Sequence, residues 1–349
     1  MIVGAGLAGC LLAWRFKQAG LPFRIIGSTT LPSAWSVAAG IINPVTGRWM
    51  TKSWNIDTLL PEAERTYCEI ENTFKMQVFH RMPVRRYCQN AEDVKRCGRR
   101  SRNPRYANVL GEYSKASASP QAIADTHGSF EILLAGYVDL PLLIETLHKH
   151  FLELSMLSDQ YFAHSQLQAM EGGWRYESVE YRQVVFCEGT GIKVNPWFNK
   201  LPLTPAKGET LILRSDTLSL PPSIYHSNKW LLPYQPQRFR IGATYDDTDP
   251  NPSPTEAGKA ELLQAAAQIL SDDHNLEVEA HMAGLRPSTK DARPFVGEHP
   301  TAKGLFVLNG LGSKGASIGP EMSRQLFEYL LNNQDLDPVV DIQRFDPSA

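Results

Sequence analysis

Six residues near the amino terminus, Gly4-Ala5-Gly6-Leu7-Ala8-Gly9, have the composition and spacing of a GxGxxG phosphate-binding turn. In such a turn the first glycine allows a sharp bend and the second lets the backbone approach a pyrophosphate, while the third lets a helix pack closely on a strand. The helix that follows offers free N–H groups and a partial positive charge to the anion. The segment therefore predicts the binding of a dinucleotide through its diphosphate.

The surroundings of this turn matter, because a GxGxxG alone is a weak signal. Met1-Ile2-Val3 has the apolar character of a strand end, and a helical apolar pattern follows from about Gly6 to Ala19. Gly20 is a natural helix stop, and Phe23-Arg24-Ile25-Ile26 predicts a second strand. Together these elements form the strand–turn–helix–strand unit that the motif requires, which disfavours a glycine turn without a ligand.

One position departs from the usual pattern of this unit. The second strand commonly ends in Asp or Glu, which binds a ribose hydroxyl. Here that position is Gly27, followed by Ser28, which can make a hydrogen bond but carries no carboxylate. We therefore expect adenosine to be bound more weakly than usual, or through other residues.

Two later segments also suit a bound cofactor. Ser36-Val37-Ala38-Ala39-Gly40-Ile41-Ile42-Asn43-Pro44 is small and apolar, so its backbone can lie flat against a planar ligand, although an ordinary buried loop is the alternative. Gln183 to Gly191 predicts a buried parallel strand that ends in a glycine turn. Cys187 lies within that strand and is predicted to be a small core residue rather than a nucleophile.

The carboxy-terminal part repeats the strand, glycine-turn and helix order. Gly304 to Gly310 predicts a strand, Leu311-Gly312-Ser313-Lys314-Gly315 a turn, and Pro320 to Leu331 a helix. The start of this helix is a second place that favours negative charge, such as a reduced flavin ring carries at its pyrimidine end. Lys314 would assist there, and the alternative is an exposed loop lysine.

The middle of the chain predicts a second domain inserted into the first. Short alternating stretches at Glu209–Arg214, Lys229–Leu232 and Phe239–Tyr245 indicate an antiparallel sheet with one wet face. Amphipathic patterns predict helices at Leu59–Met76, from Leu140 to Phe151, and at Glu256–Leu270. His148 and His150 lie two positions apart and therefore diverge on a helix, which predicts a surface role rather than a metal site.

Composition excludes several classes of protein. The 349 residues include 35 Lys and Arg against 37 Asp and Glu, which argues against a protein whose main task is to neutralise a phosphate backbone. Five scattered cysteines form no CxxC pair and fit a reducing cytoplasm. The uncharged stretch from Ile25 to Gly47 is interrupted by prolines and glycines, so no membrane span is expected. Leu7-Ala8-Gly9-Cys10 looks like a lipoprotein cleavage box, but Met1 to Gly6 in front of it contain no Lys or Arg and no long apolar stretch, so lipidation is not expected. We therefore expect a soluble cytoplasmic protein.

The segment from Arg81 to Arg105 stands out because it holds nine Arg or Lys residues and two acidic ones. It lacks the interleaved aromatic residues of a nucleic-acid stacking platform. A solvated loop and helix face is the main interpretation, and attraction of an anionic substrate or partner is the alternative.

The order of these motifs, ending in Gly284-Leu285-Arg286-Pro287-Ser288-Thr289-Lys290-Asp291-Ala292-Arg293-Pro294-Phe295-Val296-Gly297, resembles the FAD-dependent D-amino-acid oxidase superfamily, near the glycine oxidase and sarcosine oxidase group. The resemblance implies an α/β protein with a Rossmann-type FAD-binding domain and an inserted substrate domain with a mixed or antiparallel sheet. The implied FAD-binding domain comprises 1–75, 136–200 and 284–349, and the substrate domain 76–135 and 201–283. The segment 284–290 contains no cysteine that could tether the flavin, so non-covalent FAD is expected.

The resemblance also implies an activity. Hydride would pass from the carbon beside an amine nitrogen to the flavin, and oxygen or another acceptor would reoxidise the flavin. Arg286 matches the position that pairs with a substrate carboxylate, unless it is instead a structural arginine paired with Asp291. Tyr225, His226 and Tyr245 are weaker candidates for the ring face. No catalytic base and no metal site are assigned. The residues predicted to hold FAD are Gly4, Ala5, Gly6, Leu7, Ala8, Gly9, Ser28, Ser36, Ala38, Ala39, Gly40, Cys187, Gly189, Arg286, Gly310, Gly312, Ser313, Lys314 and Gly315.

Two other functions stay open at this point. One is an FAD-dependent oxidoreductase that removes a carboxymethyl group from a modified tRNA base, although the charge balance makes a nucleic-acid partner the less favoured one. The other is a flavin-binding protein without turnover, which the missing acidic residue at Gly27 keeps open. The expected partner is a small amine or amino acid, together with an electron acceptor, while the oligomeric state is left open.

Overall fold

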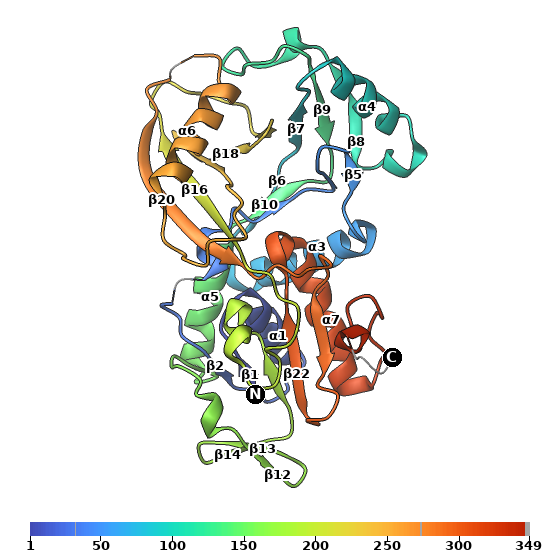
Figure 1. Ribbon diagram of the computed structural model, residues 1–349, viewed down its shortest axis with the longest axis vertical. Helices are drawn as coiled ribbons and strands as arrows, with labels where there is room; N and C mark the ends of the chain where they lie inside the picture. The colour runs from blue at the N-terminus through green and yellow to red at the C-terminus, as the bar shows by residue number, and fades with distance from the viewer. Residues whose placement is uncertain (32, 273, 346–349) are drawn as a thin grey trace.

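The computed structural model describes residues 1–31, 33–272 and 274–345, so Pro32 and the end of the predicted segment 284–349 lie outside the described residues. The chain forms two bodies stacked along the long axis of the molecule (Figure 1). One is built on a six-stranded sheet and the other on an eight-stranded sheet. Both the α/β class and the Rossmann-type arrangement predicted from the sequence are confirmed.

The six-stranded sheet places its strands in the order β11-β2-β1-β15-β22-β21. All neighbouring strands are parallel except β21, which runs antiparallel to β22. Because the strands are short and apolar and are buried on both faces, they have the continuous hydrophobic character of a central parallel sheet. Their bounds are β1 (Ile2–Val3), β2 (Ile25–Ile26), β11 (Leu157–Ser158), β15 (Val184–Phe186), β21 (Phe295–Glu298) and β22 (Leu305–Asn309).

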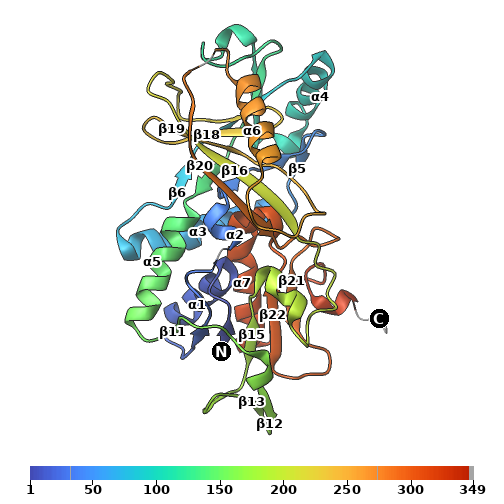
Figure 2. The same cartoon turned by 60° about the vertical axis from the view of Figure 1, so that its left-hand side comes forward.

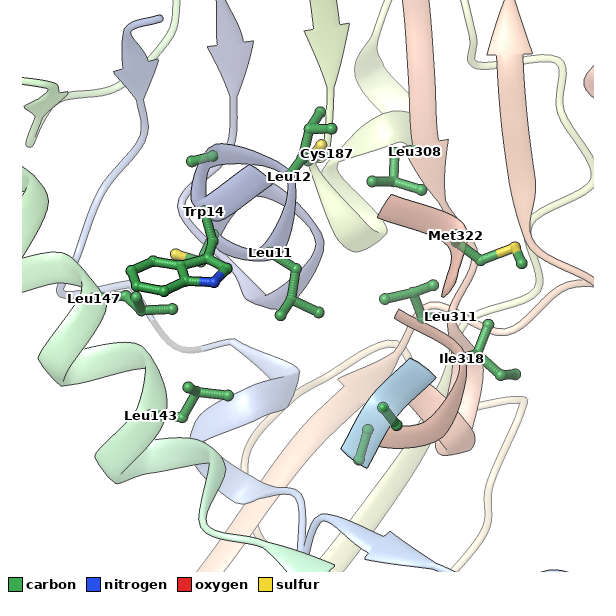
Figure 3. Packing of buried hydrophobic residues seen from close by; sticks show 14 of the residues in the cluster. Leu11, Leu12, Trp14, Leu143, Leu147, Cys187, Leu308, Leu311, Ile318 and Met322 are labelled. Carbon is green, nitrogen blue, oxygen red and sulfur yellow. The ribbon is translucent and has the colours of Figure 1, made fainter. Parts of the chain in front are cut away.

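Four long helices accompany this sheet: α1 (Leu7–Gln18), α3 (Ile56–Phe74), α5 (Leu140–Glu153) and α7 (Gly315–Asn332). Helix α1 packs against both α5 and α7, so it is buried on nearly every side. Figure 3 shows the side chains of Leu11, Leu12 and Trp14 leaving α1 in different directions, with Trp14 toward Leu147 of α5. Since each of these side chains is at most 1% exposed, the helix that carries the glycine turn is fixed by the core.

Helix α7 begins at Gly315, earlier than the predicted start at Pro320. Proline has no N–H, so it leaves the carbonyl of Ala316 without its usual helical donor. The hydroxyl of Tyr67 in α3 donates to that carbonyl oxygen at 2.6 Å. This bond from a neighbouring helix explains why the helix tolerates the proline.

The eight-stranded sheet has the order β20-β16-β19-β18-β17-β7-β9-β8 and is antiparallel apart from the pair β17–β7. Helix α6 (Glu256–Ile269) packs on β16 and β19, and α4 (Ala91–Ser101) packs on β8. The turned view in Figure 2 shows α6 beside β16 and β20. The strands are β7 (Val84–Tyr87), β8 (Leu110–Ser114), β9 (Ser129–Ile132), β16 (Ala206–Arg214), β17 (Ile224–His226), β18 (Trp230–Gln235), β19 (Arg238–Gly242) and β20 (Glu277–Arg286).

Smaller elements complete the fold. A three-stranded sheet has the order β3-β10-β6. Strands β3 and β10 belong to the predicted FAD-binding segments 1–75 and 136–200, and β6 belongs to the predicted substrate segment 76–135. The strands outside the two large sheets are β3 (Ile41–Ile42), β4 (Val45–Thr46), β5 (Thr51–Lys52), β6 (Phe79–Arg81), β10 (Gly136–Val138), β12 (Gln168–Met170), β13 (Gly173–Tyr176) and β14 (Val179–Tyr181). The short helices are α2 (Ala34–Val37), η1 (Pro104–Tyr106), η2 (Ala116–Ala118), η3 (His164–Gln166), η4 (Gly189–Val194), η5 (Gly312–Lys314) and η6 (Ile342–Phe345).

Two features are absent from the residues that the structure describes. None of the helices in this part of the chain is both long enough and apolar enough to cross a membrane. Within residues 1–31, 33–272 and 274–345, no group of three or more His, Cys, Asp or Glu side chains is placed to hold a metal ion.

Candidate functional site

The glycines of the GxGxxG turn differ in what surrounds them. Gly4 has a φ of +107°, and a Cβ on it would overlap the carbonyl oxygen of Cys187. A Cβ on Gly9 would overlap the carbonyl oxygen of Gly4. In contrast, a Cβ on Gly6 would meet nothing closer than the Trp35 ring, 3.9 Å away. Gly4 and Gly9 are therefore required by the packing of the protein itself, whereas Gly6 faces open space.

The first turn of α1 is not capped by a side chain. Gly6 is its N-cap and offers no side-chain acceptor, and the first turn contains no acidic residue. The N–H groups at the start of a helix need acceptors from outside the helix. Gly4, Ala5, Gly6, Leu7 and Ala8 all line the same cavity, so an anion in that cavity would meet these donors and the positive end of the helix dipole.

The cavity has a volume of about 590 Å³ and lies between the two bodies of the molecule. This volume falls in the range of small-molecule and cofactor sites, about 300–1,000 Å³. Its β2 end is formed by residues that follow β2, β11 and β15, among them Gly27, Ser28, Phe162, His164 and Glu188. Its β20 end is formed by the eight-stranded sheet, through Gly208, Thr210, Trp230, Ala243, Ala283, Gly284, Leu285 and Arg286.

Most of the residues predicted to hold a cofactor line this cavity, although they come from six separate stretches of the chain. They are Gly4, Ala5, Gly6, Leu7, Ala8, Ser28, Ala38, Ala39, Gly40, Cys187, Gly189, Arg286, Gly312, Ser313 and Gly315. Ser36, Gly9, Gly310 and Lys314 are not in its lining. The lining also contains residues that the sequence analysis did not select, namely Trp35, Phe162, His164, Glu188, Trp230 and Asn309.

Lys314 is held at the other side of the turn before α7. Its Nζ lies 3.3 Å from the hydroxyls of both Thr46 and Ser53. Burial lowers the pKa of this lysine, and the nearby charge of Arg293 lowers it further. Lys314 is therefore neither an exposed loop lysine nor part of the cavity wall, and it ties the α7 turn to the β4–β5 hairpin.

Arg286 lies at the end of β20 and reaches the cavity. Its Nη1 donates to the carbonyl oxygen of Lys207 at 2.9 Å, and its Nη2 donates to that of Thr244 at 3.1 Å. Gly208 makes room for it, because a Cβ there would overlap the guanidinium. Within the described residues, no carboxylate lies within ion-pair distance of Arg286, and Asp291 pairs with Arg344 at 2.9 Å instead. This excludes the alternative in which Arg286 is the structural partner of Asp291.

The other three predicted substrate residues lie outside the cavity lining. Tyr225 is 1% exposed, and its hydroxyl donates to the carbonyl oxygen of Pro221 at 2.9 Å, so it belongs to the core of the eight-stranded sheet. His226 accepts a hydrogen bond from Arg86 at Nδ1, 3.1 Å away. Burial and the charge of Arg86 lower the pKa of His226 to about 3. Tyr245 is exposed, and its ring centre lies 5.9 Å from the guanidinium carbon of Arg286.

The prediction of a surface position for His148 is wrong. This residue of α5 is 5% exposed, and its Nε2 lies 2.6 Å from the carbonyl oxygen of Ala5 in the glycine turn. Its ring also meets the edge of Trp35, which lines the cavity. His148 follows the buried Ile144 by four positions and precedes the buried Phe151 by three, so helical periodicity places all three on one face. This helical periodicity in the sequence could have predicted the buried position of His148.

A cavity that joins an anion-binding turn beside one sheet to an arginine on a second sheet, for which the described residues offer no acidic partner, defines an enzyme that uses a dinucleotide cofactor. The particular family follows from comparison with known proteins. The chain belongs to the FAD-dependent oxidoreductase family, whose model matches residues 1–329. FAD is its cofactor, and the resemblance noted from the sequence is confirmed.

Individual relatives support the same placement. The glycine oxidase of Bacillus subtilis (strain 168) is 29% identical over 153 residues, a segment that spans 42% of this chain and 42% of that protein. The tRNA 5-methylaminomethyl-2-thiouridine biosynthesis bifunctional protein of Marinobacter nauticus is 31% identical over 140 residues, which is 37% of this chain and 22% of that protein. The crystal structure of glycine oxidase from Bacillus cereus has a TM-score of 0.81 at 19% identity, covering 97% of this chain and 98% of that one. The structural match covers nearly the whole chain, whereas the alignments with these two curated relatives each span less than half of it.

The residues present fit FAD. The uncapped start of α1 and the open position of Gly6 suit a diphosphate. Gly189 has open space where a Cβ would project, and a Cβ on Gly312 would meet only Ser288, 3.9 Å away; both glycines line the cavity. The glycines at the start of α1, after β15 and before α7 therefore leave room for a long cofactor that spans the two ends of the cavity.

Proposed function

We propose that this protein oxidises the C–N bond of a small amino acid or secondary amine that carries a carboxylate, and that Arg286 holds the carboxylate. The observation that carries this proposal is Arg286 itself, a half-buried cation in the cavity wall without an acidic partner among the described residues. Buried charges in proteins are normally paired, so an arginine in this situation fits an anionic ligand. The glycine oxidases among the relatives support an amino-acid substrate.

The chain contributes position and electrostatics to this reaction. The two backbone carbonyls that accept from Nη1 and Nη2 fix the plane of the guanidinium, and its remaining N–H groups can bind a carboxylate. Trp230, Leu285 and Val37 give the same end of the cavity apolar walls that exclude water. Bound FAD supplies the acceptor for hydride from the carbon beside the nitrogen. The imine that leaves the site is hydrolysed by water, and oxygen or another acceptor takes the electrons.

We further propose that FAD is bound without a covalent link. The thiol that lines the cavity belongs to Cys187, at the end of β15, and burial raises the pKa of that thiol well above its ordinary value. A thiol in that state is a poor nucleophile. All five cysteines are free, which supports a cytoplasmic location for the protein.

Substrate carboxylate recognition is tested with a matched pair of amines. A panel of amines is first screened by the anaerobic bleaching of flavin absorbance, with sarcosine and dimethylamine as a pair that differs only in the carboxylate. Arg286→Ala should raise KM for the carboxylated amine by about 30-fold or more, because truncating one partner of a buried charge pair costs at least 2 kcal/mol. KM for the amine without a carboxylate should change little.

Arg238→Ala is the control, since Arg238 lies in the same sheet but has a side chain that is 42% exposed and paired with Glu279 at 2.7 Å. An equal rise of KM for both amines in Arg286→Ala would contradict the carboxylate role. Failure of every amine in the panel to bleach the flavin would contradict turnover on amines and would favour a flavin-binding protein without turnover.

A second candidate function, an amine oxidoreductase that acts on a modified base in RNA, is favoured by a group of residues that we call the Trp49 cluster. Trp49 is 54% exposed, and the guanidinium carbons of Arg48 and Arg96 lie over its ring, 4.6 and 4.8 Å from the ring centre. Next to it, Lys52, Arg100 and Arg105 line a hollow of about 270 Å³. The fold thus brings an exposed tryptophan to the basic segment from Arg81 to Arg105, and a stacking ring among cations suits RNA.

This second function is tested by RNA binding. Transfer RNA should bind with an affinity that falls steeply as salt rises, and Arg96→Glu/Arg100→Glu should weaken binding and flatten the salt dependence. Arg214→Glu is the control, because Arg214 is an exposed arginine of β16 paired with Asp216. RNA that neither binds at low salt nor bleaches the flavin would exclude this candidate.

A further inference from the structure

The end of β2 cannot carry the carboxylate that usually binds the adenosine ribose in a dinucleotide unit. A Cβ on Gly27 would lie 2.6 Å from the backbone nitrogen of Ala5 and 3.1 Å from its Cβ. Any side chain at this position would therefore displace the glycine turn. Ser28 lines the cavity, but its hydroxyl already shares a hydrogen bond with Thr30 at 3.2 Å.

A carboxylate stands at the end of a different strand of the same sheet. Glu188 follows β15, which pairs with β1 on the side opposite β2, and Glu188 lines the β2 end of the cavity. Its Oε1 lies 2.7 Å from Nε2 of His164, and its Oε2 accepts from Nδ2 of Asn195 at 2.7 Å. Asn195 is 0% exposed, and its own side-chain oxygen accepts from the backbone of Trp197 and Phe198, so its amide group is oriented toward Glu188.

His164 is fixed by rings on several sides. Its ring centre lies 6.1 Å from that of Phe186 in a stacked arrangement and 5.4 Å from that of Phe162 in an edge-on arrangement. The ring centre of Trp197 is 6.4 Å away. Within the described residues, its Nδ1 makes no hydrogen bond. Each carboxylate oxygen of Glu188 accepts one bond and has capacity for another, so the pair offers fixed acceptors at the wall of the cavity.

We propose that Glu188 and His164 bind the ribose hydroxyls of the adenosine half of FAD, in place of the carboxylate that Gly27 excludes. The ribose of a dinucleotide lies near the end of β2, and Gly27, His164 and Glu188 all line the same cavity, with β1 between β2 and β15. A ribose hydroxyl can donate to a carboxylate oxygen, and it can either donate to or accept from an imidazole nitrogen, which matches the open positions on Glu188 and on Nδ1 of His164. This assignment depends on FAD binding and not on the substrate proposed above.

The experiment measures cofactor binding instead of turnover. ADP and 2′,3′-dideoxy-ADP are titrated into the holoenzyme, and the FAD they displace is followed by its fluorescence. In the unmodified protein, ADP should displace FAD at about 10- to 100-fold lower concentration than the dideoxy compound, because hydrogen bonds to a charged group are lost with the hydroxyls. In Glu188→Ala this preference should fall to near unity, and FAD should dissociate more readily.

Asp159→Asn is the matched control, because Asp159 is an exposed carboxylate near β2 that is bound by Thr29 at 2.8 Å and does not line the cavity. It should keep the full preference for ADP. Glu188→Gln retains one acceptor oxygen and should show an intermediate preference for ADP over the dideoxy compound. This variant tests the assignment if Glu188→Ala folds poorly. Equal displacement by both compounds in the unmodified protein, or an unchanged preference in both Glu188 variants, would overturn the assignment.

Discussion

Nε2 of His148 lies 2.6 Å from the carbonyl oxygen of Ala5, so helix α5 is joined directly to the middle of the glycine turn. A carbonyl oxygen only accepts hydrogen bonds, so Nε2 carries the proton and donates. The thiol of Cys10 donates to the same oxygen from 3.2 Å. The backbone of the glycine turn is thus fixed at Ala5 by hydrogen bonds from the side chains of His148 in α5 and Cys10 in α1.

Replacement of His148 by Leu should lower the stability of the protein. Leu fills a similar volume but cannot donate, so the buried carbonyl of Ala5 keeps only the weak thiol donor. We expect the free energy of unfolding to fall by about 1–3 kcal/mol, measured by urea denaturation of the holoenzyme. Lys149→Gln is the control on the same helix, since Lys149 is exposed. An equal loss in the two variants would show that the bond to Ala5 contributes nothing specific.

The first strand–turn–helix–strand unit was predictable because its signals are local. The predicted helix from about Gly6 to Ala19 corresponds to α1 (Leu7–Gln18), and the predicted strands to β1 and β2. Glycine spacing and helical periodicity act over a few residues, and no distant contact is needed to interpret them. The start of α7 was predicted five residues too late, because it depends on a contact that is not local. The hydrogen bond from Tyr67, which lets the helix accommodate Pro320, comes from a distant helix.

The side chains of the site were harder to predict than its backbone. Glu188 and His164 meet only because β1 pairs with β15 and the loop after β11 folds across the end of that sheet. Tyr225 was selected for its aromatic ring, but strand alternation places it on the core side of β17. Which face of a strand is buried depends on its sheet neighbours, and short strands carry too little pattern to reveal that face.

Two glycines of the turn should respond differently to the same substitution. Gly9→Ala should destabilise the protein itself, because the new methyl group would overlap the carbonyl oxygen of Gly4. Gly6→Ala should leave the fold intact, because its nearest neighbour would be 3.9 Å away, yet it should weaken FAD binding by filling the place where the diphosphate approaches.

Thermal unfolding with and without added FAD separates these two effects. Gly6→Ala should match the parent protein in the absence of FAD and gain less stability when FAD is added. Gly9→Ala should unfold at lower temperature in both conditions. If Gly6→Ala gains as much from FAD as the parent does, the diphosphate does not lie against this glycine.

Glu209 is the buried carboxylate that joins the eight-stranded sheet to helix α6. It is 3% exposed, accepts from the backbone N–H and hydroxyl of Thr255 at 2.9 and 2.8 Å, and lies 2.7 Å from Nε2 of His281. Thr255 is the N-cap of α6, so the carboxylate also faces the positive end of that helix. Burial alone would raise the pKa of this carboxyl, but the bonds from Thr255 and His281 outweigh it and lower the pKa below 4.5.

Glu209→Gln should therefore lower the free energy of unfolding at neutral pH by about 1–3 kcal/mol, the range for hydrogen bonds to a buried charged group. The loss should depend on pH with a definite sign. A carboxyl whose pKa is lower in the folded protein contributes stability above its unfolded pKa, and that contribution disappears as pH falls through the folded pKa. Parent and variant should accordingly converge in stability as pH falls below 4.5, as measured by urea denaturation at several pH values.

Glu277→Gln serves as the control for this comparison, because Glu277 is exposed at the start of β20 in the same sheet. Its effect on stability should be within about 0.5 kcal/mol at neutral pH. A Glu209→Gln deficit that stays constant from neutral pH to below 4.5 would mean that the variant fails through packing alone. In that case the charge of Glu209 would not be what holds the start of α6 to the strand behind the cavity.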